Sequence, residues 1–128
     1  MMERPRRRIY LAGGFKSGWQ NFASQELSNF DILDPSIHNI EEPAAYTEWD
    51  LRAIRECDIL LANMEESNPG GYALALEIGY AKALGKQVIF VDQLSDSSRK
   101  RHFEMIRQAA DRVFSTMSSA LNYIATAT

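Results

Sequence analysis

The amino-acid sequence predicts a single α/β domain in which helices cover both faces of a parallel β-sheet. Short apolar runs alternate with segments of helical period along the chain, and the links between them are short. One run, within residues 58–63, is apolar without interruption, which is typical of a strand buried on both faces. The length of 128 residues fits one such domain with one hydrophobic core.

The first half of the chain contains three predicted strands and two predicted helices. Residues 8–12 form the first strand, because they are largely apolar and end at the tight turn Gly13–Gly14. Residues 30–34 form the second strand, which Pro35 ends, and a loop follows over residues 36–43. The third strand is the run at residues 58–63. Helices are predicted over residues 15–27 and 44–57 from apolar residues at helical spacing: Trp19, Phe22, Ala23 and Leu27, then Tyr46, Ala53, Ile54 and Cys57.

The second half continues the alternation. The turn Gly70–Gly71 opens a helix that Gly85 ends, as glycine commonly does after a last helical turn. Residues 88–91 are the fourth strand, and a loop over residues 92–98 supplies a Ser or Asp to cap the next helix. That helix is predicted over residues 98–110, followed by a short strand at 112–114 and a closing helix at 118–124.

The predicted architecture is a doubly wound, flavodoxin-like domain with five parallel strands in the order 2-1-3-4-5. We assign residues 1–8 to a flexible basic tail and residues 9–128 to the domain. Ligands of such folds bind at the carboxyl ends of the strands, near the point where strand order reverses. Strands 1 and 3 should be neighbours, so the turns Gly13–Gly14 and Gly70–Gly71 should meet at one cleft.

The composition excludes several classes of protein. A net charge of −3 does not favour nucleic-acid binding, and we interpret the basic run before the first strand as a solvated tail. No apolar run approaches the roughly 20 residues of a membrane span, and no signal-peptide core is present. The single cysteine, Cys57, fits a reducing compartment, so we expect a cytoplasmic protein. No Cys/His cluster suggests a metal site.

Glu77 is the most anomalous residue of the sequence. Its neighbours one helical turn away are Ala73, Leu74, Tyr80 and Ala81, so it should point from an apolar stripe. A carboxylate without a partner in such a place is costly, and it is tolerated mainly where it performs chemistry. The alternative is a structural Glu that the backbone or an arginine satisfies.

Asp50 is a second acid on an apolar helical stripe, and Tyr10 is a candidate partner of Glu77. Asp50 lies on the inward stripe of its predicted helix, although it could also be a structural cap or the partner of a buried arginine. Two inward acids from helices flanking one strand suit glycosidic chemistry, where one attacks the sugar and the other handles the leaving group's proton. Tyr10, near the end of strand 1, could hold the Glu77 rotamer or be an ordinary core tyrosine.

Further candidates surround the predicted cleft. Backbone amides in the two glycine turns could bind anions or hydroxyls, although neither turn matches a Walker loop or a dinucleotide fingerprint. Phe15 could stack on a base or pack in the core, and Lys16 could bind a phosphate or be an ordinary surface lysine. Asn63 could bind ligand or only close its turn. His38 follows Pro35 and could contact a ligand, but we interpret it as a solvated loop histidine.

These residues, in this order, resemble the nucleoside 2-deoxyribosyltransferase family. The superfamily to which that family belongs also contains nucleoside 5′-monophosphate N-glycosidases. The resemblance runs from Ile9 to the final helix, and three features carry it. They are the segment from Ile9 to Phe15, Asp50 with Asp58 eight residues on, and the segment from Glu77 to Lys86.

This resemblance implies roles for the three candidate catalytic residues. Glu77 matches the nucleophile that attacks the anomeric carbon, Tyr10 matches the tyrosine that orients it, and Asp50 matches the acid that assists the departing base. Substrate-binding residues are expected at Gly13, Gly14, Phe15, Lys16, Asn63, Gly70 and Gly71. One departure is that transferases often carry a second acid about six residues before the nucleophile, where this chain has Gly71.

The resemblance leaves three functions open. We predict the first, transfer of 2-deoxyribose between nucleobases, because it is the best-known chemistry of the family. The second is hydrolysis of a nucleoside 5′-monophosphate to free base and sugar phosphate. The third is a nucleotide-binding domain that has lost its chemistry, which the missing acid at Gly71 would suit. The resemblance implies a small-molecule nucleoside or nucleotide substrate, no metal or organic cofactor, and a homo-oligomer, a dimer or larger.

Overall fold

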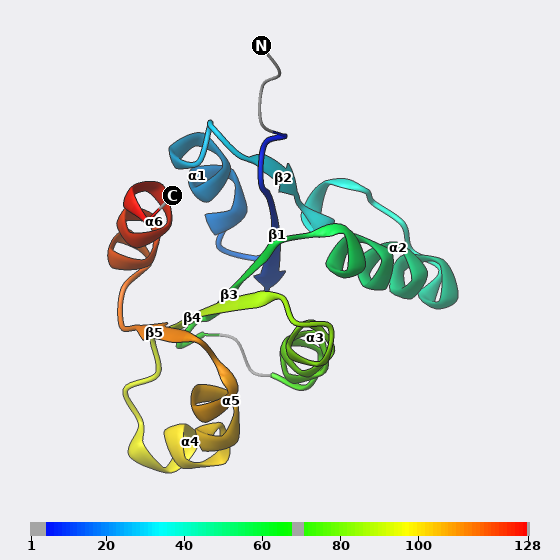
Figure 1. The fold of residues 1–128 in the computed structure, drawn as a ribbon. Helices are drawn as coiled ribbons and strands as arrows, with labels where there is room; N and C mark the ends of the chain where they lie inside the picture. The colour runs from blue at the N-terminus through cyan, green and yellow to red at the C-terminus, as the bar shows by residue number, and fades with distance from the viewer. Residues whose placement is uncertain (1–4, 68–70, 128) are drawn as a thin grey trace.

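The computed structural model of the chain, which describes residues 5–67 and 71–127, is built on a parallel five-stranded sheet (Figure 1). The strand order is β2-β1-β3-β4-β5, and all neighbouring strands pair in parallel. The strands are β1 (Arg8–Gly13), β2 (Asp31–Leu33), β3 (Ile59–Met64), β4 (Gln87–Asp92) and β5 (Arg112–Phe114). The predicted fold class and strand order are therefore confirmed.

Helices cover both faces of the sheet (Figure 1). They are α1 (Trp19–Glu26), α2 (Pro43–Glu56), α3 (Tyr72–Ala83), α4 (Ser97–His102), α5 (Glu104–Ala109) and α6 (Met117–Thr126), with a 3₁₀ turn η1 (Pro35–Ile37). Helices α1 and α6 pack on one face, and α2, α3 and α5 pack on the other. Side-chain caps begin several of these helices, from Glu42 at α2, Asp96 at α4 and Thr116 at α6.

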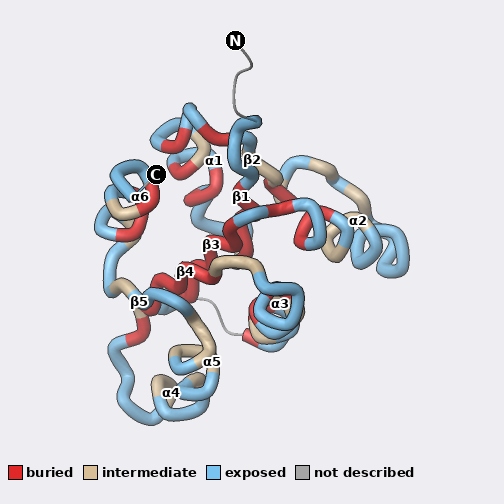
Figure 2. The backbone as a smooth tube through the Cα atoms, viewed as in Figure 1, coloured by how far each residue is buried: buried red, intermediate tan, exposed pale blue. Residues whose placement is uncertain are grey.

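The core has two layers, one on each face of the sheet (Figure 2). Side chains alternate along β1, so Ile9 and Leu11 join α1 and α6, while Tyr10 and Ala12 join α2 and α3. The central strands β3 and β4 are buried almost throughout, which is why their sequences lack a polar alternation. This alternation aims Tyr10 at the helix that carries Glu77.

The helix predicted over residues 98–110 is wrong as a single element. The structure breaks it at Phe103 into α4 and α5. Phe103 turns in to pack against the core beside α3, and neither glycine nor proline marks this break in the sequence. The helix predicted from residue 15 also begins later, at Trp19, because Gly18 has left-handed backbone dihedrals.

The start of the domain lies slightly earlier than the predicted boundary between tail and domain. Arg8 is the first residue of β1. Arg6 donates hydrogen bonds to the backbone carbonyls of Asn29 at 3.2 Å and Phe30 at 3.0 Å, and also to that of Ser28. These contacts tie the chain before β1 to the end of α1.

None of the helices in the described part of the chain is both long and apolar enough to span a bilayer. Within the same part of the chain, no three His, Cys, Asp or Glu side chains gather as metal ligands would.

Candidate functional site

Glu77 and Tyr10 contact each other at the carboxyl end of the sheet. Tyr10 is fully buried in β1, and its hydroxyl donates a hydrogen bond to Oε2 of Glu77, which is half-buried on α3. The contact joins residues 67 positions apart, and it exists because α3 packs on the face of β1 to which Tyr10 points. The hydrogen bond holds the Glu77 carboxylate in one orientation.

Glu77 lies where two hollows of the surface meet. One, the glycine limb, has a volume of about 260 Å³ and is lined by Gly13, Gly14, Gly71, Tyr72, Ala73, Leu74 and Glu77. The other, the Asp50 limb, has a volume of about 310 Å³. Its lining residues are Tyr10, Gly13, Phe15, Pro35, His38, Ile40, Tyr46, Asp50, Ala73 and Glu77. Because Gly13, Ala73 and Glu77 line both, the limbs form one cleft with the carboxylate at its centre.

Asp50 is held by His38, a residue that we expected to be solvated. Nε2 of His38 lies 3.1 Å from Oδ1 of Asp50, and Nδ1 of His38 accepts a hydrogen bond from the Ile40 amide at 3.0 Å. Since Nδ1 accepts a hydrogen bond, the ring proton lies on Nε2, and Nε2 donates a hydrogen bond to the Asp50 carboxylate. The His38 side chain is only 12% exposed, and its ring lies 4.6 Å from that of Trp49.

The interpretation of His38 as a solvated histidine is therefore wrong. A lone histidine in an irregular loop has no periodic pattern that would reveal its direction. The only signal in the sequence is the preceding Pro35, which begins the η1 turn and so directs the chain back toward α2.

Both carboxyl groups have raised pKa values. Burial raises the pKa of Glu77 to about 7, with a smaller rise from the charge of Asp50 and an opposing effect of the Tyr10 hydrogen bond. Burial likewise raises the pKa of Asp50, and the hydrogen bond from His38 opposes the rise. The pKa of Tyr10 is raised, first by burial and then by the charge of Glu77, so its hydroxyl remains a donor. Near neutral pH the Glu77 carboxyl is therefore close to the midpoint of its titration.

Three glycines and the start of α3 form much of the glycine limb. Gly71 is the N-cap of α3 and makes no side-chain capping bond, so the first amides of a 12-residue helix lack a side-chain acceptor. A Cβ on Gly13 would lie 2.7 Å from the Asn63 carbonyl oxygen, and the Gly13 φ of 149° is one that other residues rarely adopt. A side chain is therefore excluded at Gly13, and the limb lies at the positive end of the α3 dipole.

The remaining predicted substrate residues are only partly brought to the cleft. Phe15 lines the Asp50 limb, whereas Lys16 is exposed and lines neither limb. Asn63 also lines neither limb: it is buried on the strand face shared with Ile59 and Leu61, and its Oδ1 accepts a hydrogen bond from Gln93 at 2.7 Å. Gly70 lies outside the described residues.

One known protein family and several solved structures are similar to this chain. A family described as "Nucleoside 2-deoxyribosyltransferase like" matches residues 6–94. Among solved structures, a 2-deoxyribosyltransferase from Bacillus psychrosaccharolyticus superposes with a TM-score of 0.73 at 22% identity, covering 91% of each chain. A 2-deoxyribosyltransferase from Leishmania mexicana also gives 0.73, at 19% identity, covering 92% of this chain and 96% of its own.

A third similar structure is named as an N-glycosidase and not as a transferase. The CMP N-glycosidase of Clostridium botulinum gives a TM-score of 0.59 at 20% identity, covering 93% of this chain and 98% of its own. No curated protein sequence matches the chain. The structural likenesses show the shared fold, while the family match spans most of the sequence. The chain therefore belongs to the nucleoside 2-deoxyribosyltransferase-like family.

Proposed function

We propose that this protein cleaves the N-glycosidic bond of a nucleoside or nucleotide, with Glu77 as the nucleophile. One observation carries the proposal: the Glu77 carboxylate, oriented by Tyr10, lies at the junction of two limbs, one of which contains Asp50. A sugar over Glu77 would direct its base into the Asp50 limb and its 5′ end into the glycine limb. The family match and the activities named for the three solved structures support this reading.

The reaction would proceed by two displacements at the anomeric carbon. An oxygen of Glu77 forms a bond to that carbon while the carbon–nitrogen bond breaks, and the base leaves with the bonding electrons. Asp50 donates a proton to the base: burial raises its pKa, which favours the protonated form, and the His38 hydrogen bond fixes the orientation of the carboxyl group. Water or a second base then attacks the same carbon and releases Glu77, while Asp50 takes up the proton that the attacking group loses.

The glycine limb favours a substrate with a 5′-phosphate. Among its lining residues Glu77 is the only acid, and the uncapped start of α3 presents amides and a positive helix end. The described residues that line the limb thus supply no second carboxylate that would repel a phosphate. We therefore propose hydrolysis of a nucleoside 5′-monophosphate as the main activity. Transfer of 2-deoxyribose is the second candidate, because two of the similar structures are named for it.

Product analysis distinguishes these reactions. The protein is incubated with a deoxynucleoside or its 5′-monophosphate, with and without a second base, and the products are separated by chromatography. Free base and sugar phosphate from the monophosphate are expected. A new deoxynucleoside in the presence of a second base would instead identify transfer. The absence of free base with every substrate would leave the nucleotide-binding interpretation. A chelator should not change the rate, since neither route uses a metal.

The pH dependence of cleavage should report Glu77. A nucleophilic carboxylate must be ionised, so log kcat/KM is expected to rise with pH and to level off near the Glu77 pKa of about 7. Because the charge of Asp50 contributes to the raised pKa of Glu77, Asp50→Asn should move this inflection to lower pH. A pH–rate profile between pH 5 and 9, measured for the wild type and for Asp50→Asn, checks both expectations. A flat profile across pH 7 would contradict the assignment.

We also propose that a second copy of the chain covers the outer face of α3. Tyr72 is 90% exposed and Leu76 is 61% exposed, and Gly79 and Ala83 continue the same face at helical spacing. Met105, on the neighbouring helix α5, is 84% exposed. Such an apolar face on a small domain is typical of an interface, and family resemblance indicates a homo-oligomer.

Substituting Leu76→Glu should therefore lower the molecular mass in solution. A charged side chain at the centre of the face would have to be desolvated on association, and this is costly. Analytical ultracentrifugation of the variant measures the change. Phe22→Glu is the matched control, because Phe22 is 48% exposed on α1, on the opposite face of the sheet. An unchanged mass for Leu76→Glu, or an equal change for Phe22→Glu, would contradict the proposed interface.

A further inference from the structure

Phe103 occupies the space that a side chain at position 71 would need. A Cβ built on Gly71 would lie 2.7 Å from Cε1 and 2.9 Å from Cζ of the Phe103 ring, and 3.0 Å from Cε of Met64. Carbon atoms do not approach this closely without displacement, so the ring or the Gly71 backbone would have to move. Gly71 lines the glycine limb and begins α3. Phe103 therefore fixes the backbone of this wall from behind.

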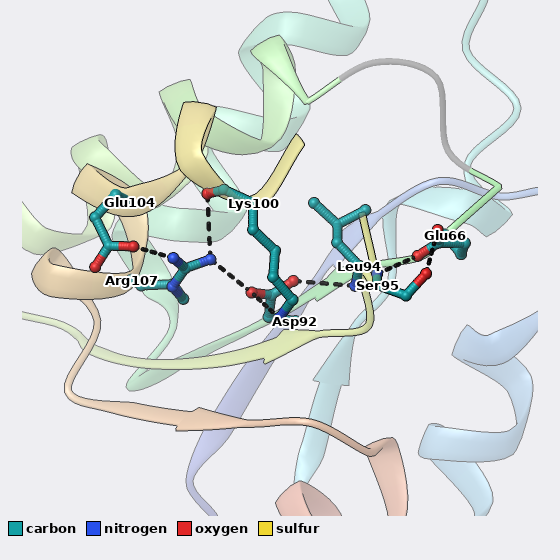
Figure 3. Close-up of polar contacts among 7 residues, drawn as sticks. All are labelled: Glu66, Asp92, Leu94, Ser95, Lys100, Glu104 and Arg107. Atoms are coloured by element: carbon teal, nitrogen blue, oxygen red, sulfur yellow. Dashed lines mark hydrogen bonds and ion pairs between the residues drawn. The ribbon is translucent and has the colours of Figure 1, made fainter. Parts of the chain in front are cut away.

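A set of polar contacts centred on Asp92 and Arg107 joins α4 and α5, which lie on either side of Phe103, to the end of β4 (Figure 3). Arg107 donates through Nη1 to Oδ2 of Asp92 at 2.9 Å and to the Lys100 carbonyl at 3.3 Å, and it also pairs with Glu104. These partners come from the end of β4, from α4 and from α5, so one guanidinium joins the elements on both sides of Phe103.

Asp92 is the buried centre of these contacts. Its side chain is 4% exposed, and it also lies 3.4 Å from Nζ of Lys100 and accepts a hydrogen bond from the Leu94 amide at 3.1 Å. A carboxylate this deeply buried needs its cationic partners, so the position of Arg107 is well determined. The break between α4 and α5 is thereby anchored to the sheet, and the Phe103 ring with it.

We propose that Phe103 is a specificity-determining residue for the 5′ group of the substrate, and that Asp92 and Arg107 are positioning residues that act through it. By excluding a side chain from position 71, Phe103 leaves a wall of backbone amides, which a 5′-phosphate can approach closely. By packing behind Gly71, it also holds the first turn of α3 in register with the phosphate. The inference rests on the proposed function, because it assigns the glycine limb to the substrate's 5′ end.

The proposal requires a selective effect of Phe103→Ala. Loosening the first turn of α3 should weaken contacts to phosphate, whereas Glu77, which Tyr10 holds, should keep its geometry. We expect KM for a nucleoside 5′-monophosphate to rise about tenfold, with kcat and the rate on the unphosphorylated nucleoside changed less than about threefold. Phe103→Leu, which keeps most of the bulk, should restore a KM near that of the wild type.

Three further variants separate the proposal from a general structural role. Asp92→Asn should raise the same KM in the same direction, while Arg101→Ala, on the exposed side of α4, should have no effect. Gly71→Ser should raise KM in the wild-type background but much less in the Phe103→Ala background, since the clash is then absent. An equal loss with nucleoside and monophosphate, or additive effects of Gly71→Ser and Phe103→Ala, would overturn the proposal.

Binding of ribose 5-phosphate provides a readout that does not depend on catalysis. Isothermal titration should show binding to the wild type and to Phe103→Leu, and about tenfold weaker binding to Phe103→Ala. If the wild type does not bind ribose 5-phosphate, or if Phe103→Ala binds it equally well, the role of Phe103 is overturned even where bond cleavage is observed. If ribose 5-phosphate binds as expected but no base is released from any substrate, the proposed catalytic function fails instead.

Discussion

Replacing Glu77 with glutamine is expected to lower kcat/KM for N-glycosidic cleavage by about three orders of magnitude or more. Glutamine keeps the size of the side chain and can still accept a hydrogen bond from Tyr10, but it cannot form the glycosyl ester. It also removes the negative charge that stabilises the positive charge of the sugar in the transition state. Single-turnover measurements with a nucleoside 5′-monophosphate test the effect on the chemical step.

The stability of the same variant shows whether the protein remains folded. In the folded protein the pKa of Glu77 is about 7, above its ordinary value of 4.5, so folding favours the protonated form. That contribution is fully present below pH 4.5 and is lost as the pH rises through about 7. Glu77→Gln should therefore raise the free energy of unfolding by about 1–3 kcal/mol at pH 8 and change it little at pH 4.

These two results for Glu77→Gln must occur together. A catalytic carboxylate is placed where its charge is costly, so removing the charge should cost activity and increase stability. If turnover is unchanged, Glu77 is not the nucleophile. If activity is lost together with stability at pH 8, the loss reflects unfolding, and the variant says nothing about attack on the sugar.

Gly13→Ala is expected to destabilise the protein by about 2–4 kcal/mol and to abolish ligand binding in the cleft. The Gly13 φ of 149° is disfavoured for alanine, and the new Cβ would meet the Asn63 carbonyl oxygen at 2.7 Å. That oxygen belongs to the backbone of the adjacent strand β3, so it cannot rotate away as a side chain could. Urea denaturation measures the loss of stability.

Gly18→Ala is the matched control for this substitution. Gly18 also has a positive φ, of 73°, but no atom lies within 4 Å of the position of its Cβ. Alanine there should cost only the backbone strain, about 1–2 kcal/mol, and should leave cleavage of the substrate intact. Equal losses of stability at the two positions would show that the close approach of β1 and β3 does not determine the effect.

The fold was largely predictable because its signals are local and repeated. The strands at residues 8–12, 58–63 and 88–91 are apolar runs between turn residues, and the structure places β1, β3 and β4 within one or two residues of them. Strand order followed from the general behaviour of doubly wound sheets. Glu77, Asp50 and Tyr10 stood out because they are polar residues at positions where the helix or strand pattern predicts an inward-facing apolar side chain. The structure brings all three to one cleft.

The features that were missed depend on contacts between distant segments. His38 reaches Asp50 across an irregular loop, and no pattern in residues 36–43 specifies its direction. Phe103, where the helix breaks, packs against Gly71, 32 residues earlier in the chain, and helical periodicity carries no sign of such a contact. Asn63 was assigned to the cleft because it ends β3, but its side chain lies on the other face of the sheet.

The brevity of the outermost strands restricts how copies of this protein can associate. β2 and β5 form the two borders of the sheet and contain three residues each, and Asp31 and Arg112 place charges on them. Edge strands that are this short and charged offer few unpaired amides and carbonyls to a strand of another molecule. They therefore disfavour extension of the sheet from one molecule into the next. Growth of amyloid-like fibres from the folded state should therefore be slow, and ordered complexes should form through helix-to-helix contacts.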